Sequence, residues 1–267
     1  MNITVVMVAY KSEHLIYKNL TNYPSDIDII IIDNSMNSKM KNKVETKNKN
    51  IKVILNHNNG FGHAANLGAN LINTKYIFFC SPDNFIENNF FEKLSRSKKK
   101  LNDNFDMLIL SNKENLISEN KKIKNAEGIS CFLIKKEAFL NLSGFDENFF
   151  LYYEDIDFLK RFLKKKYIAY KIPVYYSNYA GSHDKEFNFP VEVNRNWHYM
   201  WSKFYFEKKH NGYIYSFLKT LPYFIRSIIK VMIHYKNNEK KNIYYARASG
   251  LFNSFLLKKS WYRPSIN

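Results

Sequence analysis

Asp83 is the first residue of this sequence placed to do chemistry. It follows Ser81 and Pro82, directly after the apolar run YIFFC at residues 76–80. Proline cannot donate to a sheet ladder, so a strand must end there, and a carboxylate is among the first groups beyond it. A hard cation such as Mg²⁺ is often held by one or two carboxylates together with substrate phosphates, so Asp83 could serve if a diphosphate supplies the rest. An aspartate after proline is also common in plain turns.

A second candidate carboxylate lies in FFLYYEDIDFLKRFLKKK, residues 149–166. At 100° per residue, one helical stripe holds Ile156, Leu159, Phe162 and Leu163, with Phe158 at its edge. Asp155 falls inside this stripe, whereas Asp157, Lys160 and Arg161 lie opposite, where charges ordinarily form a solvated face. An inward carboxylate near a crevice is what a general base requires. The alternative is that Asp155 or Glu154 only caps the helix, where free amides favour negative charge.

A glycine-rich loop is the third candidate, in NNGFGHAANLG at residues 58–68. A dinucleotide fingerprint follows the first strand, whereas Gly60, Gly62 and Gly68 follow the third predicted strand, which argues against an NAD-type Rossmann protein. The segment suits a loop that opens a helix with its amides facing an anion, and it also suits a simple turn and helix cap.

Four short strands position these candidates, at residues 3–9, 28–33, 51–56 and 76–81, with helices at 13–20 and 62–71 between them. Such alternation predicts an α/β fold with a mostly parallel central sheet covered on both faces. Ligands bind beyond the carboxyl ends of such strands, so the polar residues there should converge on one crevice. Farther along we expect strands at 107–110 and 129–134, helices at 136–142 and 154–165, and exposed Asn/Lys-rich connections at 38–50 and 113–125.

The composition indicates a folded cytoplasmic chain. Its 267 residues are 45% hydrophobic, and Cys80 and Cys131 lie inside apolar runs, as is typical of free thiols in a reducing compartment. The first nine residues read as a strand and not as a signal peptide. No apolar stretch approaches the roughly 20 residues that cross a bilayer.

Most of the formal net charge of +17 lies in the last quarter of the chain, where residues 201–267 hold 13 Lys and Arg against 2 Glu, a net +11. Nucleic acid and an anionic membrane face are both suitable partners for such a tail. Apolar residues recur there at helical spacing, with Lys219, Arg226 and Lys230 mostly elsewhere around the axis: Leu218, Leu221, Ile225, Ile228, Ile229 and Met232. We expect a C-terminal helical region at 191–267 whose amphipathic helix lies either on a membrane or on the protein's own core.

Taken together, these features resemble the family-2 glycosyltransferases, especially their rhamnosyltransferase-like branch. Six motifs stand in the family's order over residues 1–180: VVMVAYKS, IIIIDNS, NHNNGFGHAANLG, FFCSPDN, GISCFLIKKEAF and GFDENFFLYYEDIDFLKRF. The resemblance implies a GT-A fold over residues 1–190, an α/β domain that binds a nucleotide sugar.

The resemblance also implies a role for each site residue. Ala9, Tyr10 and Asp33 would hold the nucleoside, and Asn59, Gly60, Phe61 and Asn66 would line the nucleotide pocket. Asp83 would lie at the diphosphate and at Mg²⁺ or Mn²⁺, and Asp155, beside Glu154, would be the base of an inverting transfer. The donor would be a dTDP- or UDP-linked sugar, rhamnose or another hexose. The acceptor would be a lipid-linked or cell-surface glycan, with the basic tail on the inner face of the cell membrane.

Three departures from the family pattern bear on these roles. The family's Asp-x-Asp motif is replaced here by Ser81, Pro82, Asp83 and Asn84, which leaves Asp83 as the one certain acidic ligand. The rhamnosyltransferase-like branch commonly has Asn-Pro-Asp at this position. Asn178 stands where the histidine of His-x-x-Gly-x-Ser is expected, and His183 either substitutes as a metal or phosphate contact or is a plain surface histidine. The segment after Asp33 lacks a second acid found in many relatives.

Two other classes of function compete with the transferase hypothesis. A polyanion-binding module would bind nucleic acid through the tail, with salt-sensitive affinity independent of Asp83 and Asp155. No DNA- or RNA-binding motif is visible, so we expect no nucleic-acid partner. A catalytically silent relative would bind nucleotide sugars and only scaffold a glycan assembly complex.

Overall fold

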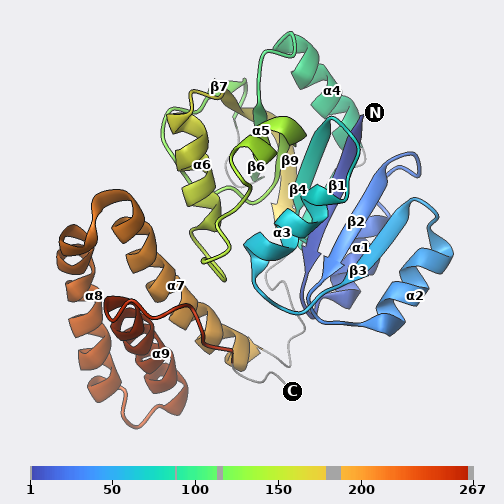
Figure 1. Ribbon diagram of the computed structural model, residues 1–267. Coiled ribbons are helices and arrows are strands. Elements are labelled where there is room, and N and C mark those ends of the chain that lie inside the picture. Colours follow the sequence, from blue (N-terminus) through green and yellow to red (C-terminus); the bar gives the residue numbers. More distant parts are fainter. Residues whose placement is uncertain (1, 88, 113–116, 179–187, 264–267) are drawn as a thin grey trace. The chain divides into compact units, whose positions relative to one another are not determined.

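Two compact units make up the chain in the computed structural model, which describes residues 2–87, 89–112, 117–178 and 188–263 (Figure 1). The first unit holds Met1–Phe145 and Asp155–Asp184, and the second holds Asp146–Glu154 and Lys185–Asn267. The segment 146–154 therefore belongs to the C-terminal unit, although it lies far from residues 185–267 in the sequence.

A mixed nine-stranded sheet forms the first unit, in the order β3-β2-β1-β4-β8-β6-β9-β5, with β7 paired to β9. The strands are β1 (Ile3–Ala9), β2 (Asp28–Asp33), β3 (Ile51–Leu55), β4 (Tyr76–Cys80), β5 (Asn84–Ile86), β6 (Met107–Asn112), β7 (Lys121–Lys122), β8 (Phe132–Lys135) and β9 (Ala169–Asn178). The first four run parallel, and β8 is antiparallel to both β4 and β6. The predicted α/β class is confirmed, with every predicted strand present within a few residues.

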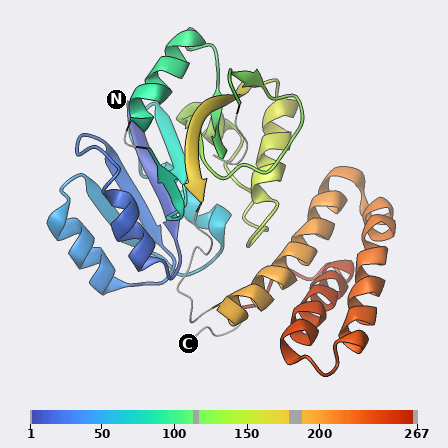
Figure 2. The same cartoon turned by 180° about the vertical axis from the view of Figure 1, so that it is seen from behind.

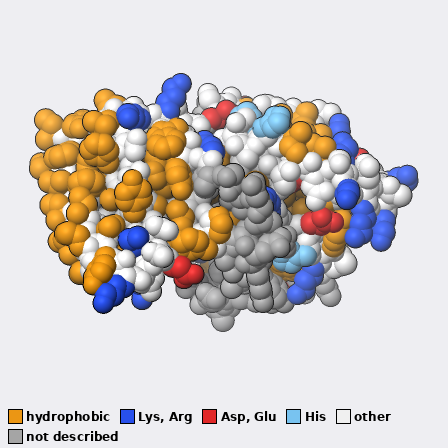
Figure 3. All heavy atoms as spheres, turned by 90° about the horizontal axis from the view of Figure 1, so that it is seen from below, with side chains coloured by type: hydrophobic (Ala, Val, Ile, Leu, Met, Phe, Trp, Pro, Cys, Tyr) orange, Lys and Arg blue, Asp and Glu red, His pale blue; other side chains and the backbone are white. Residues whose placement is uncertain are grey.

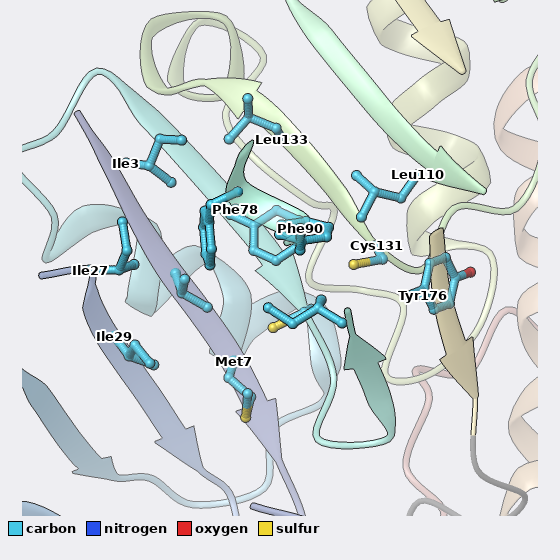
Figure 4. Close-up of a cluster of buried hydrophobic side chains, with 14 of the residues drawn as sticks. Ile3, Met7, Ile27, Ile29, Phe78, Phe90, Leu110, Cys131, Leu133 and Tyr176 are labelled. Carbon is cyan, nitrogen blue, oxygen red and sulfur yellow. The ribbon is translucent and has the colours of Figure 1, made fainter. Parts of the chain in front are cut away.

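Helices cover both faces of this sheet (Figures 1 and 2). One face buries side chains of α1 (Glu13–Leu20), α2 (Ser38–Lys47) and α4 (Phe90–Lys100). The other buries side chains of α3 (Phe61–Asn70), α5 (Lys136–Asn141) and α6 (Glu154–Lys164). Strand β1 serves both faces by alternation, because Val5 and Met7 join the first cluster and Val6 and Val8 the second. Figure 4 shows the first cluster, where Phe78 of β4 meets Phe90 of α4, with ring centroids 5.1 Å apart.

Helix α2 corrects one expectation, because residues 38–50 were predicted to be an exposed connection. Among their lysines and asparagines stand Met40 and Val44, four residues apart, and both are buried. Asn37 caps the helix, since its side chain accepts the backbone N–H of Met40 at 2.9 Å. Two apolar residues on one face and a cap are enough for a helix that packs on a core.

Helix α6 corrects a second expectation. Phe158, Leu159 and Phe162 are fully buried as predicted, but Asp157, assigned to a solvated face, is fully buried as well. Its carboxylate accepts the Nε–H of Arg161 at 2.8 Å. The same guanidinium donates to the carbonyls of Leu142 at 2.7 Å and Gly144 at 2.8 Å. The charge run is therefore a clamp that holds α6 to the turn after α5.

Three helices form most of the second unit: α7 (Asn188–Asn211), α8 (Tyr213–Ile233) and α9 (Asn238–Phe255). Gly250 allows α7 and α9 to approach closely, because a Cβ there would lie 2.3 Å from the carbonyl oxygen of Trp197. The segment 146–154 packs on α7, where the rings of Phe149 and Tyr205 lie 4.8 Å apart and Ser202 Oγ donates to the carbonyl of Leu151 at 2.9 Å.

The predicted amphipathic helix is confirmed as α8, but the side chains on its inner face include small hydroxyl residues. Ser216, Thr220 and Ser227 are buried and donate to backbone carbonyls four residues back. The predicted apolar stripe lies largely outward, since Leu218 and Met232 keep more than 60% of their surface exposed. Within the described residues, no helix is both long and apolar enough to cross a membrane.

Removing the carboxylate of the α6 clamp tests its contribution to the fold. Asp157→Ala leaves the guanidinium of Arg161 without its buried counter-ion, so the free energy of unfolding should fall by about 3 kcal/mol. Denaturant unfolding measures this change, with Lys164→Ala as the control, because Lys164 is exposed on the same helix. The control should change stability by less than about 0.5 kcal/mol. A similar small change for Asp157→Ala would show that the pair does not hold α6 in place.

Candidate active site

Polar residues meet where β1, β2 and β3 end. Ala9 and Asp33 are register partners at the ends of β1 and β2. The Asp33 carboxylate is buried and accepts the backbone N–H groups of Ser35 at 3.0 Å and Asn37 at 2.7 Å. It therefore shapes the loop after β2, while each oxygen keeps a further acceptor position.

An amide chain links this edge to the glycine-rich loop. The Asn34 side chain accepts from Asn56 Nδ2 at 2.7 Å and approaches Asn58 Oδ1 at 3.5 Å. Asn58 Oδ1 also accepts the N–H of Gly60 at 3.3 Å. The Asn58 side chain hydrogen bonds with the side chain of Tyr10. Burial raises the pKa of Tyr10, so this hydroxyl stays protonated at neutral pH. The convergence predicted for the strand ends is present for these residues.

The glycine-rich loop opens α3 as expected. Gly60 adopts φ 106°, a conformation that other residues rarely adopt, and precedes the first helical residue, Phe61. Asn59 is exposed. Asn66 engages the backbone of Phe145 with both ends of its amide, accepting its N–H and donating to its carbonyl at 2.9 Å each. Asn66 thus holds the turn before residue 146, and its predicted nucleotide contact stays a prediction.

The turn after β4 presents Asp83 from a rigid frame. The backbone N–H of Asn84 donates to the carbonyl of Ser81 at 2.9 Å, which closes a turn around Pro82 and Asp83. Asn84 Oδ1 accepts the N–H of Ser81 at 2.8 Å. From α1, the buried Asn19 donates to the carbonyls of Pro82 and Asn84 at 3.0 Å each. Asp83 itself is half-buried, and nothing in the sequence marked Asn19 as its support.

Asn178 also supports this turn. It ends β9, opposite Asn84 of β5, and its Oδ1 accepts Asn84 Nδ2 at 2.7 Å. The residue that stands where the family pattern expects histidine is therefore part of the frame that carries Asp83. His183 lies outside the described residues.

Asp155 lies in the first turn of α6, and its Oδ2 accepts the backbone N–H of Ile129 at 2.8 Å. Gly128 lies next to this carboxylate, since a Cβ there would be in ordinary van der Waals contact with Oδ2, at 3.4 Å. Burial raises the pKa of Asp155 above its usual value of 3.8, although hydrogen bonds from the amides of Ile129, Ile156 and Asp155 itself act in the opposite direction. Burial has the larger effect, which makes the group more basic than an exposed aspartate.

Strand register brings Asp83 and Asp155 to the same edge of the sheet. Phe79 of β4 pairs with Phe132 of the antiparallel β8, so the residues just before β8 lie beside those just after β4. Asp83 is close enough to Cys131 for its charge to contribute to the raised pKa of that thiol. Two residues earlier, Ile129 holds Asp155. Asp155 is therefore held at residue 129, and the Asp83 turn follows β4, whose antiparallel neighbour β8 begins just after residue 131.

Glu154 is placed differently from its neighbour Asp155. It is buried and belongs to the C-terminal unit. Tyr152 and Tyr153 precede it with φ of 68° each, and their rings lie 5.6 Å and 5.7 Å from that of Tyr199 on α7. Two successive bulky residues in the left-handed region cost conformational energy, and such strain is common next to functional groups.

Asp83 is the candidate metal ligand that lies among the described residues. The described residues contain no group of three or more His, Cys, Asp or Glu side chains arranged to hold a metal ion. Asp83 offers the oxygen donors that Mg²⁺ and Mn²⁺ prefer, at a turn whose backbone is fixed. The donor set therefore fits a cation shared between one carboxylate and a diphosphate.

Comparison with solved structures supports the fold. The first 349 residues of TarS from S. aureus align with 93% of this chain and 91% of that one, at 12% identity and a TM-score of 0.56. The mannosyltransferase PcManGT from Pyrobaculum calidifontis, solved with GDP-Man and Mn²⁺, aligns with 97% of this chain and 88% of that one, at 12% identity and a TM-score of 0.58. TarS 1–349 in complex with UDP-GlcNAc aligns with 98% of this chain and 93% of that one, at 12% identity and a TM-score of 0.54.

The sequence itself decides the family. No curated protein matches the chain. The model of the family described as "Glycosyl transferase family 2" matches residues 4–180, which run from β1 to just beyond β9 and include every described candidate of the first unit. The chain therefore belongs to glycosyl transferase family 2.

Proposed function

We propose that this protein transfers a sugar, rhamnose or another hexose, from a dTDP- or UDP-linked donor to a glycan hydroxyl, with inversion at the anomeric carbon. The observation that carries the proposal is the carboxylate of Asp155, oriented by the Ile129 amide at the sheet edge that also bears Asp83. A basic carboxylate beside a candidate diphosphate site is the arrangement that a single displacement requires.

The donor would lie along the ends of β1–β4. Ala9, Tyr10 and Asp33 would hold the nucleoside, supported by the amide chain of Asn34, Asn56 and Asn58. Asn59, Gly60, Phe61 and Asn66 would line the nucleotide pocket. Asn59 is the most accessible of these four, because it is exposed at the tip of the loop.

Asp155 would act as the general base, with Glu154 as the second acid of the motif. The carboxylate takes the proton of the acceptor hydroxyl while that oxygen bonds to the anomeric carbon. The bond from this carbon to the diphosphate oxygen breaks at the same time, and its electron pair leaves with the nucleoside diphosphate. Attack from the face opposite the leaving group inverts the configuration without a covalent enzyme intermediate.

Asp83 would hold Mg²⁺ or Mn²⁺ together with the donor diphosphate, with His183 as a further candidate ligand. The cation, when bound, neutralises negative charge on the leaving diphosphate. PcManGT, solved with Mn²⁺ and GDP-Man, shares this fold and supports the assignment. The protein's own contribution is the turn fixed by Asn19, Asn84 and Asn178.

The outward face of α8 would rest on an anionic bilayer at the inner surface of the cell membrane. Figure 3 shows hydrophobic side chains gathered over the C-terminal helices, with Lys and Arg among and around them. A groove on α8 is lined by apolar residues, including Leu218, Ile225 and Ile229, together with Arg226 and Lys230. Apolar area flanked by cations matches the chemistry of anionic lipid, and a lipid-linked acceptor would be reached there.

Asp155→Asn should lower turnover by about 10²-fold or more while leaving donor binding nearly intact, because an amide cannot take the proton. Single-turnover transfer and donor titration measure the two quantities. Glu137→Gln, an exposed substitution on α5, is the matched control. Unchanged turnover in Asp155→Asn would remove Asp155 as the base, and donor binding by the native chain without transfer would identify a silent relative.

The same variant tests the environment of Asp155 through pH. Because the folded-state pKa is raised, the native protein loses stability as pH rises from about 3.8 through that pKa, since the ionised form is disfavoured. Asp155→Asn lacks this loss, so its melting temperature should exceed the native value at pH 7 to 8. The difference should shrink as pH falls toward 4. A difference that grows on acidification would contradict the burial of the charge.

Asp83→Asn should weaken metal-dependent donor binding by about tenfold, a loss of about 1.4 kcal/mol in the stabilisation that the donor provides. Thermal shift against a panel of nucleotide sugars, with and without Mg²⁺ or Mn²⁺, measures this and identifies the donor. Asp26→Asn, an exposed acid in the same unit, is the control. Equal metal dependence in Asp83→Asn would show that the cation is held elsewhere.

Cosedimentation with phosphatidylglycerol vesicles tests the α8 surface. Arg226→Gln with Lys230→Gln should weaken binding by roughly 30-fold, at about 1 kcal/mol for each charge, and Ile225→Gln with Ile229→Gln should weaken it by at least roughly tenfold. Leu71→Gln with Leu140→Gln, two exposed apolar residues outside this helix, should have little effect. Vesicle binding that none of the α8 variants weakens would exclude a lipid surface there. If the native chain self-associates and Ile225→Gln with Ile229→Gln abolishes this, the face belongs to an interface with a second copy of the chain.

A further inference from the structure

The C-terminal unit contains a cavity of about 380 Å³ with a chemistry that the transferase site does not use. It lies between the segment 146–150, helix α7 and the chain that follows α9. Four cations line it, Lys208, Lys258, Lys259 and Arg263, against a single acid, Glu147. The aromatic side chains of Phe150, Trp201, Phe204 and Tyr205 form the rest of its principal lining.

Two acids of this unit are engaged with lysines that do not line the cavity. Asp146 pairs with Lys209 at 2.7 Å, and Glu207 pairs with Lys219 at 2.7 Å. Among the described residues, none of the four pocket cations forms an ion pair with a carboxylate. A concave surface with this excess of positive charge attracts a multiply charged anion.

The chain after α9 is fixed in place and does not behave as a loose basic tail. Leu257 takes φ 56° and turns the backbone, so that the N–H of Lys258 donates to the carbonyl of Asn253 at 3.0 Å. The carbonyl of Lys258 accepts the indole N–H of Trp201 at 3.0 Å. The two lysines are therefore placed at the cavity by their backbone.

The last described residues are held by a buried histidine. Both ring nitrogens of His198 are engaged, Nδ1 with Ser260 Oγ and Nε2 with the carbonyl of Tyr262, each at 2.9 Å. Arg263 follows, with its guanidinium carbon 3.4 Å from the centroid of the Phe150 ring. Guanidinium groups arranged in this way offer planar donors to phosphate oxygens.

We propose that this cavity binds a phosphate or diphosphate group carried on an apolar chain. The cations would hold the phosphate oxygens, and the accessible Leu257 and Tyr205 side chains would cover part of the apolar chain. A small inorganic anion would leave this apolar part of the lining without a contact. Phosphate on an apolar chain is the chemistry of a lipid-linked glycan acceptor, and that identification, unlike the binding itself, rests on the proposed function.

Isothermal titration of the full chain with geranyl diphosphate and with inorganic diphosphate tests the proposal. We expect geranyl diphosphate to bind more tightly than inorganic diphosphate, and Lys258→Ala with Lys259→Ala to weaken it by at least about tenfold. Arg263→Gln is a second, independent variant, and quenching of tryptophan fluorescence is a second readout, because Trp201 lines the cavity.

Lys236→Ala with Lys240→Ala is the matched control, because it removes the same charge from the same unit outside the cavity. The control should bind like the native chain. Undiminished affinity in both pocket variants, or no binding of geranyl diphosphate, would overturn the proposal, and equal binding of the two probes would overturn its apolar part. Stabilisation by a nucleotide sugar is measured separately, so a failure of the transferase proposal remains distinguishable from a failure of this one.

Discussion

The buried ion pair between Asp157 and Arg161 is the interaction on which the arrangement of the first unit most depends. A charge inside a core is tolerated only when its partner and remaining hydrogen bonds are supplied, and here the guanidinium also binds two carbonyls of the turn after α5. Asn66 of α3 holds the other end of that turn at Phe145. Residues 142–145 are therefore held from both α3 and α6.

Gly144 shows how tightly this junction is built. It adopts φ +62°, and a Cβ there would lie 2.3 Å from Asn66 Oδ1. The chain then passes through the C-terminal unit before returning as α6, with Asp155 in the first helical turn. The position of the proposed base thus follows from a clamp two residues farther along the same helix, and the backbone amide of Ile129 sets its orientation.

The C-terminal unit differs from the first unit because α8 buries small polar side chains and exposes large apolar ones. Small hydroxyl side chains of α8 face inward and satisfy their hydrogen bonds on the backbone, while many large apolar side chains face outward. Asp146 and Glu207 pair with lysines outside the cavity, and the cavity lining holds four cations against one acid, Glu147. The bilayer proposed for α8 and the ligand proposed for the cavity share one chemistry, an apolar body with a negatively charged head, and both features suit it.

The sequence by itself determined β1–β4, β6 and β8, most of the helices, the α/β class and the family, because these depend on periodicity, on proline and glycine, and on motifs that are local in the chain. It did not predict β5, β7 or β9. It also found the residues at the strand ends, since parallel strands bring them to one edge whatever the details of packing. It misassigned residues 38–50, where only Met40 and Val44 carry the helical signal.

Tertiary structure decided the rest. A helical wheel cannot tell whether Asp157 and Arg161 face solvent or pack against the protein. What decides this is the turn at 142–144, whose carbonyls bind Arg161 and which lies outside the helix. The sequence also could not show that the amides of Asn19 and Asn178 support the Asp83 turn, because they lie 63 or more residues away from it. Nor could it show which face of α8 is exposed, because that depends on the helices packed against it.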